Sequence, residues 1–133
     1  MGSARGAVGA RDARLDATLL ALADPARRGV VELLRRAPRK ASDLALALSL
    51  TRPAMSRHLR VLRQTGLVSE RGLEHDARVR LYQLERAPFA ELKSWLEEVE
   101  AFWADQLQAF KVHAERRAPV TPLAGKRRRP RMS

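Results

Sequence analysis

At 133 residues, the chain is long enough for one domain with a modest hydrophobic core and too short for two ordinary ones. It has no cysteine, which excludes disulfides, thiolate metal ligands and thiol catalysis, and no apolar run approaches the roughly 20 residues of a membrane span. Its 26 basic residues against 15 acidic ones give a formal net charge of +11, which favours a polyanionic partner. No long apolar block follows the first arginines, so we expect no signal peptide, no membrane partner and a cytoplasmic location.

The charge is unevenly distributed along the chain. Residues 27–80 hold 13 basic and 5 acidic residues, whereas residues 85–115 hold 3 basic and 7 acidic ones. Residues 116–133 hold 7 basic residues and no acidic one. A chain adapted only for solubility does not need this separation, so the basic middle is the candidate for contact with a polyanion.

The first helices are marked by local signals. Residues 1–14 lack periodicity and predict a disordered arm, and the leucines that begin at Leu15 predict a short helix. Asp24 and Pro25 then have the pattern of an N-cap and a first helical residue, and Pro38 ends the helix that follows.

A helix-turn-helix is predicted over residues 42–66. Ser42 is the expected cap of a short helix, Thr51 is the expected cap of the next, and Gly66 is placed to end it in a left-handed conformation. Met55, Leu59 and Leu62 recur at i, i+4 and i+7, which predicts one buried face. The other face carries Ser56, Arg57, Arg60, Arg63 and Gln64.

A basic hairpin, a wing, is predicted over residues 67–84. Its second strand loses strict alternation between Leu81 and Tyr82, and either a bulge or a strand covered on both sides explains that. The wing arginines, Arg71, Arg78 and Arg80, are candidates for contact with flanking DNA.

A long helix is predicted over residues 88–116. At 1.5 Å per residue it spans about 42 Å, which is more than a small winged domain covers, so its apolar seam needs a second surface. Five of the six aromatic residues lie on this acidic helix and none on the basic one, whereas a single-strand or RNA binder needs aromatic residues beside its basic groove. Residues 117–133 predict a basic disordered tail, either solvated or acting as a non-specific arm on DNA.

The fold class is therefore mainly α with a small β-hairpin: a winged helix-turn-helix over residues 15–116 with a long C-terminal dimerisation helix. The second helix of such a motif has the width that the DNA major groove admits, and arginine side chains reach phosphates or guanine.

The stretches "ADPARR" and "RPAMSRHLRVLRQTGLV" are similar to the ArsR-type winged-helix transcriptional regulators, and the likeness covers roughly residues 15–115. It is strongest to the branch with tryptophans on the last helix and no metal cysteines. Ser49 departs from the pattern, because the family often has glycine in that turn. The resemblance implies a homodimer that binds palindromic double-stranded DNA, usually as a repressor. It implies DNA contacts by Thr51, Arg52, Ala54, Ser56, Arg57, His58 and Arg60.

The resemblance also implies pairing through the first and last helices. The apolar residues there give the predicted dimer interface: Leu15, Leu19, Trp95, Val99, Phe102, Trp103, Leu107 and Phe110.

The histidines support neither a metal site nor catalysis. His58 is either a donor to phosphate or packed beside Leu62, and His75 lies in the wing loop as a solvated residue. Asp105 and His113 are eight residues apart with no second histidine on their helix, whereas zinc needs about four ligands. We expect no metal, no cofactor and no enzymatic activity, and no motif identifies a small-molecule effector.

The predicted function is a metal-independent, sequence-specific transcriptional repressor in the cytoplasm, associated with the nucleoid. Two alternatives stay open. One is a chromosome-coating or RNA-binding protein driven by total charge, and the other is a domain that serves protein–protein contact through the acidic helix.

Overall fold

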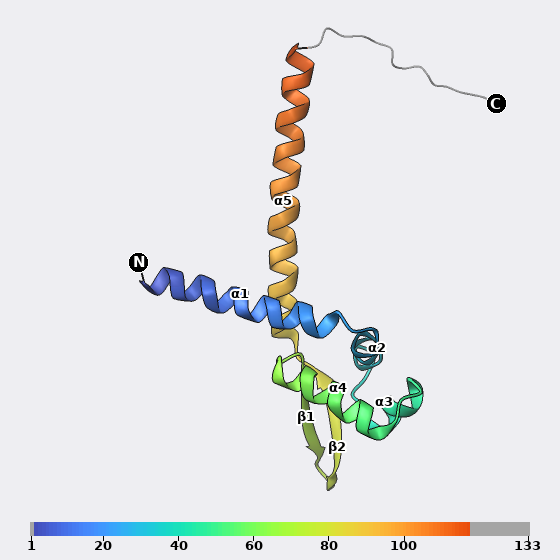
Figure 1. Cartoon of the computed structure of the whole chain (residues 1–133). Helices are drawn as coiled ribbons and strands as arrows, with labels where there is room; N and C mark the ends of the chain where they lie inside the picture. Colours follow the sequence, from blue (N-terminus) through green and yellow to red (C-terminus); the bar gives the residue numbers. More distant parts are fainter. Residues whose placement is uncertain (1, 118–133) are drawn as a thin grey trace, which may run out of the picture. The chain divides into compact units, whose positions relative to one another are not determined.

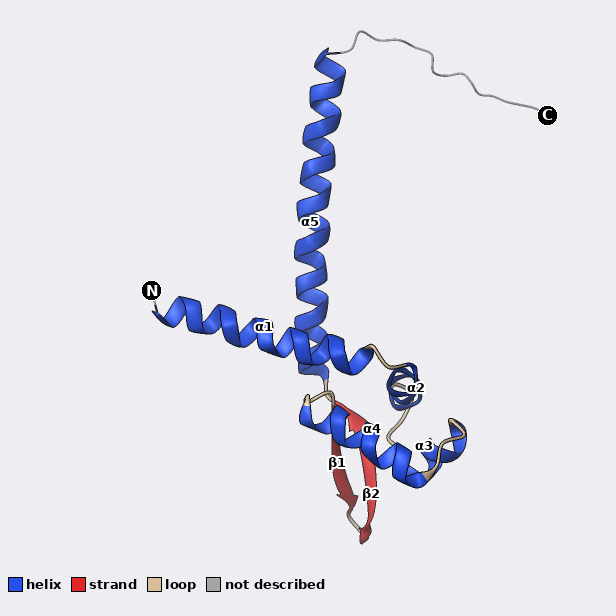
Figure 2. Ribbon diagram, in the orientation of Figure 1, coloured by secondary structure: helices blue, strands red, loops and turns tan. Residues whose placement is uncertain are grey.

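The computed structural model describes residues 2–117 and shows five helices and one antiparallel hairpin in that range (Figures 1 and 2). The elements in chain order are α1 (Gly2–Leu22), α2 (Pro25–Leu34), α3 (Ala41–Ala47), α4 (Arg52–Gln64), β1 (Val68–Leu73), β2 (Asp76–Leu84) and α5 (Arg86–Arg117). The basic tail predicted over residues 117–133 lies, apart from Arg117, outside the described residues.

Helix α1 is longer than the sequence pattern indicated. The disordered arm expected over residues 1–14 is not what the structure shows, because α1 already begins at Gly2. Alanine recurs at positions 4, 7, 10 and 13, and its high helix propensity sustains a helix without apolar periodicity. The guanidinium of Arg14 holds this segment to α5 through Glu91, with Nη2 2.7 Å from Oε2. The same contact lowers the pKa of the Glu91 carboxyl.

Helices α2 and α3 begin differently. The predicted cap at Asp24 is confirmed, because its Oδ1 accepts hydrogen bonds from the amides of Ala26 at 2.8 Å and Arg27 at 3.2 Å. The predicted cap at Ser42 is wrong: α3 begins at Ala41, and Lys40 holds the cap position without a side-chain bond. Asp43 lies in the first turn of α3 instead, where its charge complements the helix dipole.

Two consecutive helices end in the same backbone motif. After α4, Gly66 has φ +80° and the amide of Leu67 donates to the carbonyl of Leu62 at 3.0 Å. After α3, Ser49 has φ +56° and the amide of Leu50 donates to the carbonyl of Ala45 at 2.9 Å. This is the six-to-one closure in which glycine is usual, so the left-handed position predicted at Gly66 is confirmed. Ser49 adopts the same conformation and carries backbone strain.

These two positions predict opposite effects on stability. A Cβ at Gly66 meets nothing within 4 Å, so Gly66→Ala introduces no clash and costs only the strain of a left-handed alanine. We therefore expect the free energy of unfolding to fall by about 1 kcal/mol. Ser49→Gly removes the same kind of strain, so we expect the free energy of unfolding to rise by about 0.5 kcal/mol. The gain is small because glycine's greater freedom in the unfolded chain offsets part of it. Urea unfolding of both variants measures the two signs. A destabilised Ser49→Gly variant would contradict strain at this turn.

The core lies between α2, α3, α4 and the base of the hairpin. Its largest fully buried side chains come from α2, α3, α4 and the residue before β1: Val30, Leu44, Met55, Leu59, Leu62 and Leu67. The buried face predicted for α4 is confirmed, because Met55, Leu59 and Leu62 are each at most 2% exposed. Helix α4 is thereby fixed in one rotation about its own axis.

The hairpin is anchored at its base and regular over most of its length. The pairs run from Val68 with Leu84 to Gly72 with Arg80, and the register shifts between Gly72 and Leu73. The irregularity therefore lies near the turn, and the stretch at Leu81 and Tyr82 pairs regularly, with both residues half-buried. Of the two explanations for the lost alternation there, the two-sided strand is correct. Arg39 pairs with the free edge of β2 at Tyr82, with N–O distances of 2.8 and 3.0 Å.

Helix α5 confirms the long helix predicted over residues 88–116, with ends at Arg86 and Arg117. The chain divides into two compact units, one up to Ser94 and one from Trp95 onward, and α5 continues from the first into the second. Within residues 95–117 most side chains are exposed, including Phe102, Trp103, Leu107 and Phe110 at 60–70%. No helix within residues 2–117 is both long and apolar enough to span a membrane.

Candidate nucleic-acid interface

Helix α4 starts where the sequence predicts. The hydroxyl of Thr51 accepts a hydrogen bond from the amide of Ala54 at 3.2 Å, and Pro53 occupies the first turn, where its missing N–H leaves no bond unmade. The helix then runs without interruption to Gln64. The predicted cap is confirmed, and it fixes the end of the helix that would enter a DNA groove first.

Three exposed arginines of α4 have no acidic neighbour among the described residues. At 100° per residue, Arg57, Arg60 and Gln64 lie opposite the buried face, and all three are exposed. Among residues 2–117, no hydrogen bond or ion pair engages the guanidinium of Arg52, Arg57 or Arg60. These guanidiniums therefore keep all their donors available for phosphate oxygens or for guanine O6 and N7.

The smaller residues of this face lie beside the arginines. Thr51 and Ser56 are exposed, and Ala54 is half-buried. Short hydroxyl side chains near a helix start contact phosphates or bases, and an alanine methyl contacts the methyl group of thymine. Except for Ala54 and His58, every predicted DNA-facing residue of α4 and its cap is exposed.

His58 lies toward α2 and not on the outer face of α4. Its ring is half-buried, and Nδ1 is 3.4 Å from Nη1 of Arg27. The half-buried ring agrees with the packed arrangement, with Arg27 of α2 as its polar neighbour, and contact of His58 with phosphate stays a prediction. His58 thus links the candidate reading helix to α2.

Two arginines of α2 have a structural role that the sequence did not reveal. The Nε of Arg27 donates to the carbonyl of Ala21 at 2.8 Å and its Nη2 donates to Leu20 at 3.2 Å, while Nη1 of Arg28 donates to Leu22 at 2.8 Å. These carbonyls form the end of α1, which has no basic residue in its own last turn. Arg27 and Arg28 therefore cap the C-terminal end of α1 from the next helix. Part of the basic charge of residues 27–80 thus already has partners within the protein.

The cap of α2 predicts a pH dependence of stability. Burial alone would raise the pKa of Asp24, but the amides of Arg27 and Ala26, with the charges of His58 and Arg27, lower it below its ordinary value. A carboxyl whose pKa is lowered by folding contributes its full stabilisation when the pH is above its pKa in the unfolded chain, about 3.9. That contribution is lost as the pH falls through the pKa of the same carboxyl in the folded protein. Asparagine caps about as well but does not titrate, so Asp24→Asn isolates the effect of the charge.

We expect Asp24→Asn to be less stable than wild type at pH 6 and equal to it once the pH lies below the lowered pKa. Urea unfolding at a series of pH values measures the difference. Asp16→Asn, which changes an exposed acid on α1, is the matched control and should show a smaller difference. A difference in the free energy of unfolding between wild type and Asp24→Asn that stays constant as the pH falls would contradict this account of the cap.

The wing arginines differ in how free they are. Arg71 is exposed, and no hydrogen bond or ion pair holds it in the described part of the chain. Arg78 pairs with Asp76 at 3.3 Å near the hairpin turn, and Arg80 pairs with Glu70 at 3.5 Å. Because Arg71 faces Leu81 in the ladder and Arg80 faces Gly72, their side chains lie on opposite faces of the wing.

Glu70 is a functional candidate that the sequence analysis missed. Its Oε1 lies 3.6 Å from Nη2 of Arg63 on α4 and 3.5 Å from Nη2 of Arg80 on β2. Burial, and then the Glu70 carboxylate, raise the pKa of Tyr82, which is its partner across the hairpin. No spacing in the sequence marks this contact, because its three members lie on three different elements.

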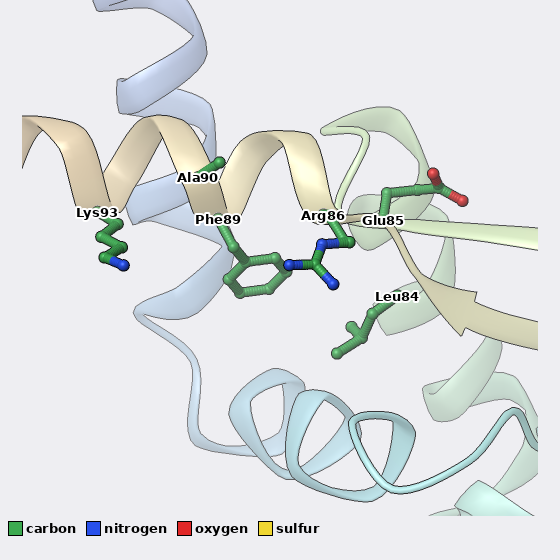
Figure 3. A pocket seen from close by; sticks show the side chains of 6 residues that line it. All are labelled: Leu84, Glu85, Arg86, Phe89, Ala90 and Lys93. Carbon is green, nitrogen blue, oxygen red and sulfur yellow. The ribbon is translucent and has the colours of Figure 1, made fainter.

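A hollow of about 410 Å³ lies away from the arginine face of α4, at the start of α5. Figure 3 shows Leu84, Phe89, Arg86 and Lys93 directed to one side of it, while Glu85 points the other way. The Glu85 carboxylate instead accepts a hydrogen bond from the hydroxyl of Ser69 on β1. None of the residues that line this hollow is a predicted DNA contact, so it forms no part of the candidate interface.

Comparison with known proteins agrees with this geometry. The profile of bacterial regulatory proteins of the arsR family matches residues 24–70, from the cap of α2 to the first strand of the wing. The HTH-type transcriptional regulator Rv2034 of Mycobacterium tuberculosis is 37% identical over 90 residues, which are 68% of this chain and 78% of that protein. The transcriptional repressor SdpR of Bacillus subtilis is 34% identical over 50 residues, 38% of this chain and 56% of that protein.

A solved structure extends the match to nearly the whole described chain. An ArsR-like transcriptional regulator from Rhodococcus sp. RHA1 is 32% identical with a TM-score of 0.70, over 84% of this chain and 98% of that one. Its likeness includes the winged helix-turn-helix and is not confined to the profile match. The chain therefore belongs to the ArsR family of bacterial regulatory proteins, which are DNA-binding regulators of transcription with a winged helix-turn-helix.

Proposed function

We propose that the protein is a sequence-specific repressor that binds a palindromic operator as a homodimer. In each protomer α4 lies in the major groove of one half-site and the wing follows the flanking backbone. One observation carries this proposal: the exposed, unpaired guanidiniums of Arg57 and Arg60 on a helix whose rotation is fixed by three buried apolar residues.

The remaining contacts are assigned by position. Arg57 and Arg60 are placed to read guanine, while Thr51, Arg52 and Ser56 at the helix start are placed for phosphates and bases. His58 reaches DNA only at the margin of this face, since its ring packs toward Arg27. Arg71, Arg78 and Arg80 would contact the backbone beside the half-site.

The homodimer rests on exposed apolar surface. Trp95, Val99, Phe102, Trp103, Leu107 and Phe110 lie within one stripe along α5, and a stripe of this size is rarely left in water. On α1, Leu19 is 43% exposed and available to a partner, whereas Leu15 is 6% exposed and already packed within its own chain. Dimers of helix-turn-helix proteins bind half-sites one DNA turn apart, about 34 Å, and we expect the same spacing for the two copies of α4.

The sign of regulation and the independence from metal are parts of the same proposal. Repression agrees with the name of the Bacillus subtilis relative. Metal independence is proposed from the ligand chemistry, because cysteine is absent and His113 has no second histidine on its helix. We place the protein in the cytoplasm, on the nucleoid, and assign it no enzymatic activity.

Selection from a random duplex library tests this function. We expect the enriched sequence to be palindromic with half-site centres 10–11 base pairs apart, and to be bound at least about a thousandfold more tightly than its scrambled version. Binding is expected to be unchanged by a chelator. A chromosome-coating protein would show no preference over the scrambled duplex, and that result would overturn the proposal.

A further inference from the structure

A single carboxylate joins the candidate reading helix to the wing. The Oε1 atom of Glu70 is within 3.6 Å of guanidinium nitrogens of both Arg63, in the last turn of α4, and Arg80, on β2. Glu70 itself is only 21% exposed, while the two arginines are about half exposed. Helix α4 also contacts β1 directly, and Figure 1 shows this helix beside the hairpin.

The pairing separates the arginines into two groups. Arg52, Arg57, Arg60 and Arg71 have no acidic partner among the described residues, so they meet DNA with all their donors available. Arg63 and Arg80 each direct one guanidinium nitrogen to the same carboxylate, so part of their charge is neutralised before either meets phosphate. A carboxylate that stays between them also repels nearby phosphates.

Phosphate contacts are independent of sequence, and base contacts are not. On an operator, the base contacts of α4 fix the register of the protein, and freed arginines can bind only phosphates that this register brings near. On other DNA no register is fixed, and freed arginines can bind any phosphate within reach. Releasing Arg63 and Arg80 therefore strengthens binding to unrelated DNA more than binding to the operator.

We propose that Glu70 is a specificity-determining residue that withholds Arg63 and Arg80 from the DNA backbone and so limits binding to unrelated sequences. This inference rests on the proposed function, since it concerns the same DNA-reading face. Glu70 makes no base contact in this account and acts through the two arginines.

The test uses the full chain and two duplexes, the selected operator and its scrambled version, at several salt concentrations. We expect Glu70→Gln to bind the scrambled duplex roughly tenfold more tightly and to reduce the ratio of the two affinities. The slope of log K against log salt should steepen by about 1.8 per protomer, the value for two added phosphate contacts. Glu74→Gln removes the same charge from an exposed residue of the wing turn that pairs with no arginine among the described residues, and it is the matched control.

A combined variant separates release of the arginines from a general change of charge. With Arg63→Ala and Arg80→Ala in place, adding Glu70→Gln should change the slope no more than Glu74→Gln does. If Glu70→Gln alone matches the control, or binds scrambled DNA more weakly than wild type, the inference is overturned and Glu70 only supports the wing. If instead wild type does not prefer its operator, the proposed function fails first, so the two failures are distinguishable.

Discussion

Replacing Leu62 with alanine is expected to lower the free energy of unfolding by about 2–5 kcal/mol, the range for deleting a large apolar side chain from a packed core. Leu62 is 0% exposed and lies on the buried face of α4. The cavity would form directly beneath the arginine face, so DNA binding should weaken along with stability. Urea unfolding followed by circular dichroism measures the loss.

Leu46→Ala is the matched control for this change. Leu46 is on α3 in the same motif but is 82% exposed, so the same deletion should alter stability by no more than about 0.5 kcal/mol. Equal losses in the two variants would contradict the placement of the core under α4.

Removing two large side chains from the stripe on α5 should separate the proposed dimer. Trp103 and Leu107 are 60% and 61% exposed in the single chain, so neither supports the fold of the protomer. The double variant Trp103→Ala, Leu107→Ala is expected to weaken dimerisation at least about 100-fold, because buried aromatic and aliphatic anchors carry most of the affinity of such interfaces. Sedimentation equilibrium measures the dissociation constant.

The control is Gln108→Ala, on the opposite side of α5 from the stripe, which should leave the dimer unchanged. Operator binding should fall in the double variant at concentrations where wild type is dimeric, since each protomer then holds one half-site alone. A double variant that remains as dimeric as wild type would show that the subunits pair elsewhere.

The helix that carries the proposed contacts could be predicted almost completely because its signals are local. Thr51, Pro53 and Gly66 mark its ends through the chemistry of the backbone, and the spacing of its apolar residues sets its buried face. Each signal depends on residues within one or two turns, so no knowledge of the tertiary structure is needed.

The length of α1 could not be predicted from apolar periodicity. Apolar periodicity reports burial, and residues before Leu15 have little of it, although alanines favour a helix without burial. The contact between Arg14 and Glu91 joins residues 77 apart and leaves no pattern in the sequence.

The features missed at the candidate interface share this long-range character. The chain brings Arg27 to His58 across 31 residues, and Glu70 to arginines on two other elements. Charge counting treats every arginine as available, whereas the fold uses Arg27 and Arg28 for α1 and pairs Arg63 and Arg80 with Glu70. Only the tertiary structure separates arginines with structural partners from those left open to DNA.

The affinities of Arg57→Ala and Arg60→Ala for the selected operator and its scrambled version test the central claim most directly. Each substitution should cost about 1–3 kcal/mol on the operator and much less on the scrambled duplex, and thermal unfolding should remain that of wild type because both side chains are exposed. Wild-type affinity for the operator in both variants would contradict the assignment of this face to DNA.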